Sequence, residues 1–124
     1  MNNFKHIYFS YFRGCKITWL GGDKYRITEY YSNGKKYWEE DYLNGKLHGK
    51  YIGWYANGNK WWEVDYLNGE RHGKDIGWHD NGNKRWEEDY LNGKLHGKYI
   101  GWWENGKKSW EADYLNGKLI KKIL

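Results

Sequence analysis

The chain has 124 residues, no proline and one cysteine, and aromatic residues make up 21% of it, a content that excludes an intrinsically disordered chain. Its net charge of +5 comes from interleaved acids and bases, which argues against a basic nucleic-acid groove. No apolar run is long enough to span a membrane, and residues 1–13 lack the uninterrupted apolar region of a secretory signal, so we expect a cytoplasmic protein.

Residues 1–29 look like a degenerate form of the sequence that follows them. The stretch 18–22 (TWLGG) resembles 41–45 (DYLNG), and 8–14 resembles an eroded version of 51–58. Repeat arrays need closed ends. We therefore expect residues 1–29 to form capping hairpins of the same sheet.

From residue 30 the dipeptide Asn-Gly recurs at alternating intervals of 11 and 13 residues and defines a 24-residue repeat. The Asn-Gly dipeptides begin at Asn33, Asn44, Asn57, Asn68, Asn81, Asn92, Asn105 and Asn116. Asn-Gly favours tight turns because both residues tolerate a positive φ, and such a period indicates an array of one supersecondary unit. The sequence predicts an all-β protein, an elongated and twisted single antiparallel sheet of successive hairpins. Four repeats occupy 30–118, the last one truncated, and 119–124 forms an edge segment.

Each repeat predicts two strands, for example 60–67 and 74–79. Because side chains alternate between faces, the Trp and Tyr of the first strand share one face and its Glu and Asp share the other. The turn at Asn57-Gly58 then decides which residues pair. A three-residue turn with a bulge at Gly58 pairs Ile52 with Trp62, whereas a two-residue turn pairs Ile52 with Glu63. We expect the bulged turn, because it gathers every constant Trp, Tyr and Ile on one face.

Comparison of the copies within the chain separates constant from variable positions. The constant aromatic and glycine positions, expected to form the structural frame, are Trp38, Tyr42, Gly53, Trp54, Trp62, Tyr66, Gly77, Trp78, Trp86, Tyr90, Gly101, Trp102, Trp110 and Tyr114. The variable positions, where we expect partner specificity, are Tyr37, Tyr55, Trp61, His79, Arg85, Trp103 and Ser109. The series Tyr51, Asp75 and Tyr99 varies as well.

The constant glycines fall in mid-strand, where Gly costs about 0.5–1 kcal/mol relative to Ala. We expect an aromatic ring from a neighbouring strand to lie across each bare backbone, the alternative being a ligand that approaches it there.

The histidines at positions 48, 72 and 96 form one series that could suggest a metal site. Equivalent positions lie two strands apart, about 9–10 Å, and zinc ligands lie about 2 Å from the metal, so the three cannot share an ion. We interpret each His-Gly pair as fixing the turn between the two strands of its repeat.

Paired carboxylates such as Glu63 and Asp65 occur on one face of every repeat and can serve glycoside hydrolysis. A pair present in all four copies is better explained by contacts to the lysines at 50, 74 and 98. We expect no enzymatic activity, with no catalytic residue, metal or cofactor.

The segment 41–50 (DYLNGKLHGK), which recurs from Asp65 and Asp89, resembles the MORN repeat. The other half of the unit, Tyr/Trp-x-x-Asn-Gly-x-Lys, is similar to the bacterial and viral variant of that repeat found in YwqK-type antitoxins. The resemblance covers roughly residues 18–118. It implies an elongated sheet of hairpins and interaction rather than catalysis: scaffolding, dimerisation, lipid-headgroup contact in some members and toxin neutralisation in others.

The leading hypothesis is thus a non-enzymatic scaffold that binds a protein partner, such as a toxin, or a second copy of itself. The alternative is ligand binding through the aromatic side chains, to an anionic lipid headgroup, a carbohydrate or a single-stranded nucleic acid. The interleaved acids disfavour polyanions, and nucleic acid above all.

Overall fold

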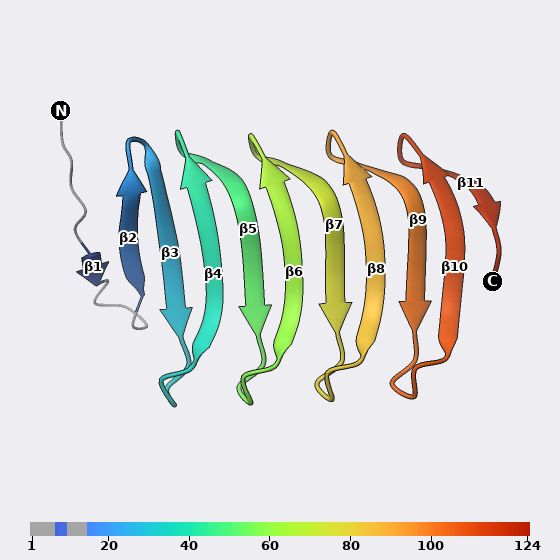
Figure 1. Ribbon diagram of the computed structural model, residues 1–124, viewed down its shortest axis with the longest axis horizontal. Helices are drawn as coiled ribbons and strands as arrows, with labels where there is room; N and C mark the ends of the chain where they lie inside the picture. Colours follow the sequence, from blue (N-terminus) through green and yellow to red (C-terminus); the bar gives the residue numbers. More distant parts are fainter. Residues whose placement is uncertain (1–6, 10–14) are drawn as a thin grey trace.

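The computed structural model describes residues 7–9 and 15–124, which form one open antiparallel sheet of eleven strands in sequence order (Figure 1). The strands are β1 Ile7–Phe9, β2 Lys16–Gly21, β3 Lys24–Tyr30, β4 Lys36–Leu43, β5 Lys46–Trp54, β6 Lys60–Leu67, β7 Glu70–Trp78, β8 Lys84–Leu91, β9 Lys94–Trp102, β10 Lys108–Leu115 and β11 Lys118–Lys122. The predicted all-β sheet of successive hairpins is confirmed. Within the described ranges, no helix is long and apolar enough to cross a membrane.

In the N-terminal region, β2 and β3 pair with each other, and β3 pairs with β4, so the sheet continues through this segment. Most of the eroded copy at 8–14 lies outside the described residues. The boundaries of the capping region and of the repeats stay predictions.

The two Asn-Gly series form two different turns. Asn44, Asn68, Asn92 and Asn116 have φ between 50° and 52°, and the glycine after each also has a positive φ. These are two-residue turns of the type I′ kind, in which the paired residues Leu67 and Glu70 directly flank Asn68-Gly69. The second strand of a repeat therefore begins at Glu70, four residues before the predicted start at Lys74. The His-Gly pair lies inside that strand, where Gly73 (φ 86°) marks a bulge.

The other series closes a longer loop. The amide of Tyr55 donates to the carbonyl of Asn59 (2.8 Å), and the amide of Gly58 donates to the carbonyl of Tyr55 (2.9 Å). Gly58 has φ 94°, as the bulged three-residue turn requires. The Asn57 side chain accepts from the amide of Asn59 (2.8 Å), so this Asn caps the loop from its side chain and does not adopt a positive φ itself.

The predicted pairing of Ile52 with Trp62 is wrong. Ile52 pairs with Glu63 and Gly53 with Trp62, because Trp61 is an extra, unpaired residue between Lys60 and Trp62. The loop has the predicted shape, but this second bulge shifts the register by one. The Trp61 ring lies over Gly53: its ring carbon Cε3 is 2.9 Å from where a Cβ on Gly53 would be.

That shift divides the constant residues between two faces. The aromatic face carries Trp38, Trp62, Trp86 and Trp110 with the mid-strand glycines and the constant tyrosines. The charged face carries the constant acids, Lys50, Lys74 and Lys98 with Ile52, Ile76 and Ile100, and also Trp54, Trp78 and Trp102. The expectation that all constant aromatics share one face is therefore wrong.

The sheet has no second layer over either face in the described part of the chain. Val64 and Ala112, both on the aromatic face, are its only fully buried hydrophobic side chains. Domains normally bury one face of a sheet against another element. Here the large side chains are half-buried and cover one another along the sheet.

Candidate interaction surface

The variable residues gather at one end of the aromatic face, beside the three-residue loops. In every repeat the residue at the second bulge is variable: Tyr37, Trp61, Arg85 and Ser109. The residue that precedes each loop (Tyr55, His79, Trp103) lies next to it, as the Tyr55 and Trp61 rings show at 6.5 Å between centroids. We call this set of seven residues the loop-end strip. The structure brings all seven candidate partner-binding residues together in it.

Two members of the strip also join repeats to one another. The Tyr55 hydroxyl donates to the carbonyl of Trp78 (2.7 Å), and the Nε2–H of His79 donates to the carbonyl of Trp102 (3.0 Å). Tyr31 makes the equivalent bond to Trp54 (2.5 Å). Trp103 occupies the same position in the last repeat, and its side chain is 62% exposed.

The bulge residues cover the mid-strand glycines unequally. The ring of Trp61 lies over Gly53, and that of Trp86 lies over Gly77, so the predicted ring over a bare backbone is confirmed at these two positions. Over Gly101 the nearest atom is the Ser109 hydroxyl, 3.1 Å from a Cβ position. A hollow of about 400 Å³ remains there, lined by Arg85, Trp86, Tyr99, Trp103, Ser109 and Trp110.

A polar cluster interrupts the middle of the aromatic face. Asp75 is 2% exposed, and one of its carboxylate oxygens accepts hydrogen bonds from the indole N–H groups of Trp62 (2.6 Å) and Trp86 (3.1 Å). Arg71 lies 3.5 Å from the other oxygen and donates to the Tyr90 hydroxyl (2.8 Å). The cluster occurs once in the described chain, at the junction of two repeats, because the equivalents of Arg71 are leucines and those of Asp75 are tyrosines.

Glu88 lies directly across the strand pair from Asp75. Burial, and then the negative charge of Asp75, raise the pKa of Glu88 from 4.5 to about 7. The Tyr90 hydroxyl donates to its carboxylate (3.2 Å) and opposes this rise only in part. Sequence reasoning missed this cluster. Positions 71 and 75 both differ from the residues found at the equivalent positions of the other repeats, and this double difference within one repeat was the signal that could have revealed the cluster.

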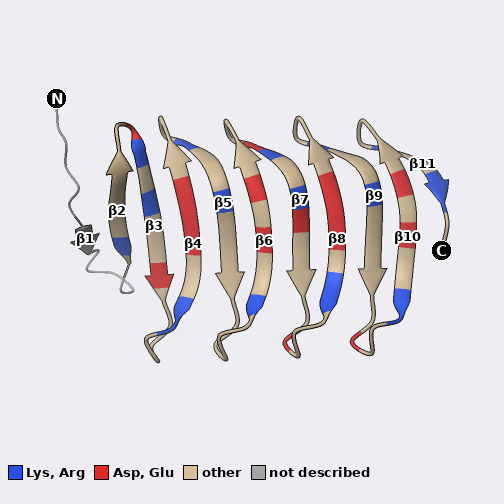
Figure 2. Ribbon diagram, viewed as in Figure 1, with Lys and Arg blue, Asp and Glu red and all other residues tan. Residues whose placement is uncertain are grey.

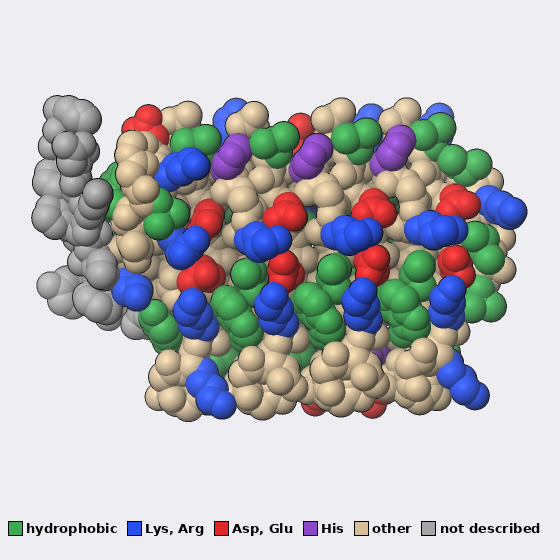
Figure 3. Space-filling view, in the orientation of Figure 1, with side chains coloured by type: hydrophobic (Ala, Val, Ile, Leu, Met, Phe, Trp, Pro, Cys, Tyr) green, Lys and Arg blue, Asp and Glu red, His purple; other side chains and the backbone are tan. Residues whose placement is uncertain are grey.

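On the charged face, acids and lysines form repeating contacts across the strands. Lys74 lies 3.0 Å from Asp89 and 3.3 Å from Glu87, and the sets around Lys50 and Lys98 have the same arrangement. The hydrogen bond that Lys74 donates to Asp89 is the main cause that raises the pKa of Lys74. Figure 2 shows acids on β4, β6, β8 and β10, and also on β3 and β7, and Figure 3 shows rows of opposite charge across this face. The predicted acid–lysine contacts are confirmed.

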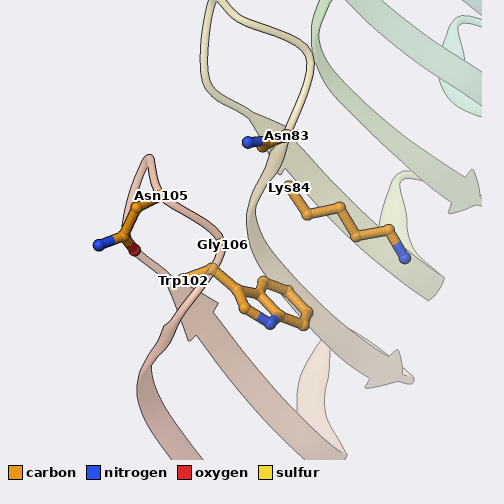
Figure 4. A pocket seen from close by; sticks show the side chains of 5 residues that line it. All are labelled: Asn83, Lys84, Trp102, Asn105 and Gly106. Carbon is orange, nitrogen blue, oxygen red and sulfur yellow. The ribbon is translucent and has the colours of Figure 1, made fainter.

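The tryptophans of the charged face lie beneath lysines from the neighbouring strand. The ammonium groups of Lys36, Lys60 and Lys84 lie 5.6–6.0 Å from the ring centroids of Trp54, Trp78 and Trp102. Figure 4 shows the hollow beside Trp102, bounded by Lys84 and the loop residues Asn83, Asn105 and Gly106. Because Lys84 also contacts Glu87, this hollow offers a donor-rich rim without a free positive charge.

Of the histidine series, His48 contributes to a turn, whereas the equivalent Nδ1 of His96 is buried without a hydrogen-bond partner among the described residues. Nδ1 of His48 accepts from the amide of Asn68 (3.3 Å), so it supports the turn of the following repeat instead of its own. In the described part of the chain, no three His, Cys, Asp or Glu side chains lie together as a metal site would require.

Comparison with known proteins adds no family to these observations: no protein-family model matches the chain, and neither does any curated protein.

Proposed function

We propose that the chain is a non-enzymatic repeat scaffold that binds a protein partner through the loop-end strip. One observation carries the proposal: the four bulge residues and the three residues that precede the loops differ from repeat to repeat, and they lie together at one end of the aromatic face. A surface that changes from repeat to repeat on an unchanging frame is suited to specific recognition. Tyr37, Trp61, Trp103 and Arg85 are residue types that supply much of the energy in protein interfaces.

The alternative, a polyanionic ligand, has weaker support. The lysines of the charged face are matched by carboxylates within 4 Å, which neutralise much of the attraction for phosphate or sulfate groups. The aromatic face carries Asp75 and Glu88 in its centre. A toxin, as the MORN-like sequence implies, is one class of protein partner that suits this scaffold.

Affinity capture from the source cells tests the proposal. The tagged protein is compared with a double variant of the strip, Tyr37→Ala with Arg85→Ala, and with Lys74→Ala on the charged face as the matched control. We expect at least one protein that the wild type and Lys74→Ala retain and the strip variant loses. Identical capture by all three, or no specific capture, contradicts the proposal.

A further inference from the structure

An indole ring covers the mid-strand glycine in two repeats, whereas in the third the nearest side-chain atoms over it are the small Ser109 hydroxyl and the Trp110 Cβ. Trp61 fills the space over Gly53 from within the chain, which shows that this site on the sheet accepts a flat aromatic ring. Ser109 holds the equivalent position beside Gly101 and leaves the hollow of about 400 Å³. The last repeat therefore has room for an aromatic ring beside Gly101, and its own bulge residue, Ser109, does not fill that room.

No hydrogen bond holds the tryptophan at the back of this hollow. The indole N–H groups of Trp62 and Trp86 both donate to Asp75, but the indole N–H of Trp110 is buried and has no acceptor among the described residues. Tyr99 stands at the position equivalent to Asp75. The Trp110 ring is held by packing and by Lys122, 5.1 Å from its centroid, so it can adjust to an incoming ring.

An exposed indole ring, that of Trp103, lies beside the hollow. Trp103 lines the hollow and is 62% exposed, the highest value among the exposed large hydrophobic residues of the described chain. Exposed tryptophan is a common anchor of protein interfaces. Trp103 and the hollow complement each other in size and chemistry, but they are neighbours in one chain and Trp103 forms the wall of its own hollow.

The charges around the hollow are complementary in the same way. Arg85 is exposed and lies over the Trp86 ring (5.9 Å), and within the described residues it has no carboxylate within 4 Å. Glu104 follows Trp103, is exposed, and likewise has no cation within 4 Å among those residues. Glu104 is adjacent to Trp103 in the chain, and Arg85 lines the hollow. A Trp103 ring that entered this hollow from another copy would therefore bring Glu104 close to Arg85.

We infer that two copies of the chain pair through their aromatic faces about a two-fold axis at the loop end. Each copy inserts Trp103 into the hollow over the other's Gly101 and places Glu104 beside the other's Arg85. Such a contact is self-complementary, as a two-fold interface requires, and it closes on itself. It also gives the single-layer sheet the second layer that its half-buried aromatic face lacks. The inference rests on the proposed function, since it names a second copy as a partner of the strip.

Sedimentation velocity over a range of protein concentrations tests the inference. We expect the wild type to dimerise, and Trp103→Ala to weaken dimerisation at least about tenfold, as loss of an interface anchor does. Ser109→Trp should weaken it to the same degree, because it fills the hollow as Trp61 does in its own repeat. Circular dichroism and urea unfolding verify that both variants stay folded. Lys74→Ala, on the opposite charged face, is the control that should dimerise like the wild type.

A charge-reversal cycle tests the orientation of the pair. Arg85→Glu and Glu104→Arg should each weaken dimerisation several-fold, and the two together in one chain should restore it, because the reversed charges face each other again. A wild type that is monomeric at every concentration overturns the inference, and so does a Ser109→Trp variant that dimerises normally or a double reversal without recovery. A monomer that still captures a different protein through the strip leaves the proposed function standing.

Discussion

On β8 the consecutive residues Glu87 and Glu88 lie on opposite faces of the sheet. The carboxylate of Glu87 accepts a hydrogen bond from Lys84, which is the main cause that lowers its pKa, and Lys74 adds to the effect. Glu88 is half-buried opposite Asp75, and its pKa is raised to about 7. The same residue type, one position apart, is stabilised as an anion on one face and disfavoured as an anion on the other.

Contacts on the two faces accordingly differ in how much they contribute to stability. The charged face repeats the same contacts around three lysines, exposed to solvent, where ion pairs contribute little. The aromatic face excludes water more completely, so each departure from the repeat has a large local consequence. Substitutions on the aromatic face should therefore change stability more than substitutions on the charged face.

The largest expected effect separates two aspartates. Asp75→Ala removes the acceptor of two indole N–H groups and one partner of Arg71, and should lower the free energy of unfolding by about 2–4 kcal/mol. Asp65→Ala on the charged face breaks only an exposed contact with Lys50 and should cost less than about 1 kcal/mol. Urea unfolding followed by tryptophan fluorescence measures both. Equal losses would contradict the difference between the faces.

A second comparison uses the glycines of the aromatic face. Gly77→Ala places a Cβ inside the ring of Trp86 and should destabilise the sheet by about 1–3 kcal/mol through overpacking. Gly101→Ala meets first the Ser109 hydroxyl, at 3.1 Å, which can rotate away, so its loss should be clearly smaller. Thermal unfolding of the two variants gives the order. The reverse order would show that the hollow over Gly101 is closed in solution.

The third prediction concerns pH. Because the pKa of Glu88 is about 7 in the folded chain and about 4.5 when unfolded, the folded chain binds more protons between these values. Its contribution to stability is therefore present at low pH and is lost as pH rises through 7. Unfolding measured from pH 5 to pH 8 should show this decline in the wild type and a flatter profile in Glu88→Gln.

Glu87 supplies the control of opposite sign. Its lowered folded pKa stabilises the chain above the unfolded value near 4.5, and that contribution is lost as pH falls below it. Glu87→Gln should thus leave the decline between pH 5 and pH 8 unchanged. If Glu87→Gln abolished the decline instead, the assignment to Glu88 would be wrong.

The smallest effect is expected for a lysine of the charged face. Lys74→Met removes contacts to Glu87 and Asp89 and should change the unfolding free energy by about 0.2–1 kcal/mol at low salt. The difference from the wild type should shrink as salt is added, since exposed charges are screened. Salt-independent destabilisation of several kcal/mol would show that this face is not merely solvated.

The strands, their order and the acid–lysine contacts followed from the sequence, because turn residues and alternation are local properties. The register did not. It depends on a second bulge, which recurs at Trp61, Arg85 and Ser109, three different residue types that share no local signal for it. The start of β7 was placed too late for a similar reason: the strand absorbs His72-Gly73 as a bulge, and no local signal separates a bulge from a loop. The burial of Asp75 was missed because its partners lie on β6 and β8.

The side chains of the three-residue loops join one repeat to the next by donating forward along the chain, whereas at the opposite edge the amides of Gly69, Gly93 and Gly117 donate back to the repeat before. Tyr55 reaches the carbonyl of Trp78, and Asn57 reaches that of Asp80, each 23 residues further on. Every junction is thus a contact between nearest neighbours, and none depends on how many repeats stand on either side. A chain with one repeat more or fewer would keep identical junctions. Adding or removing one repeat would therefore change the length of the sheet by about two strand spacings, 9–10 Å, and would leave the fold of the other repeats unchanged.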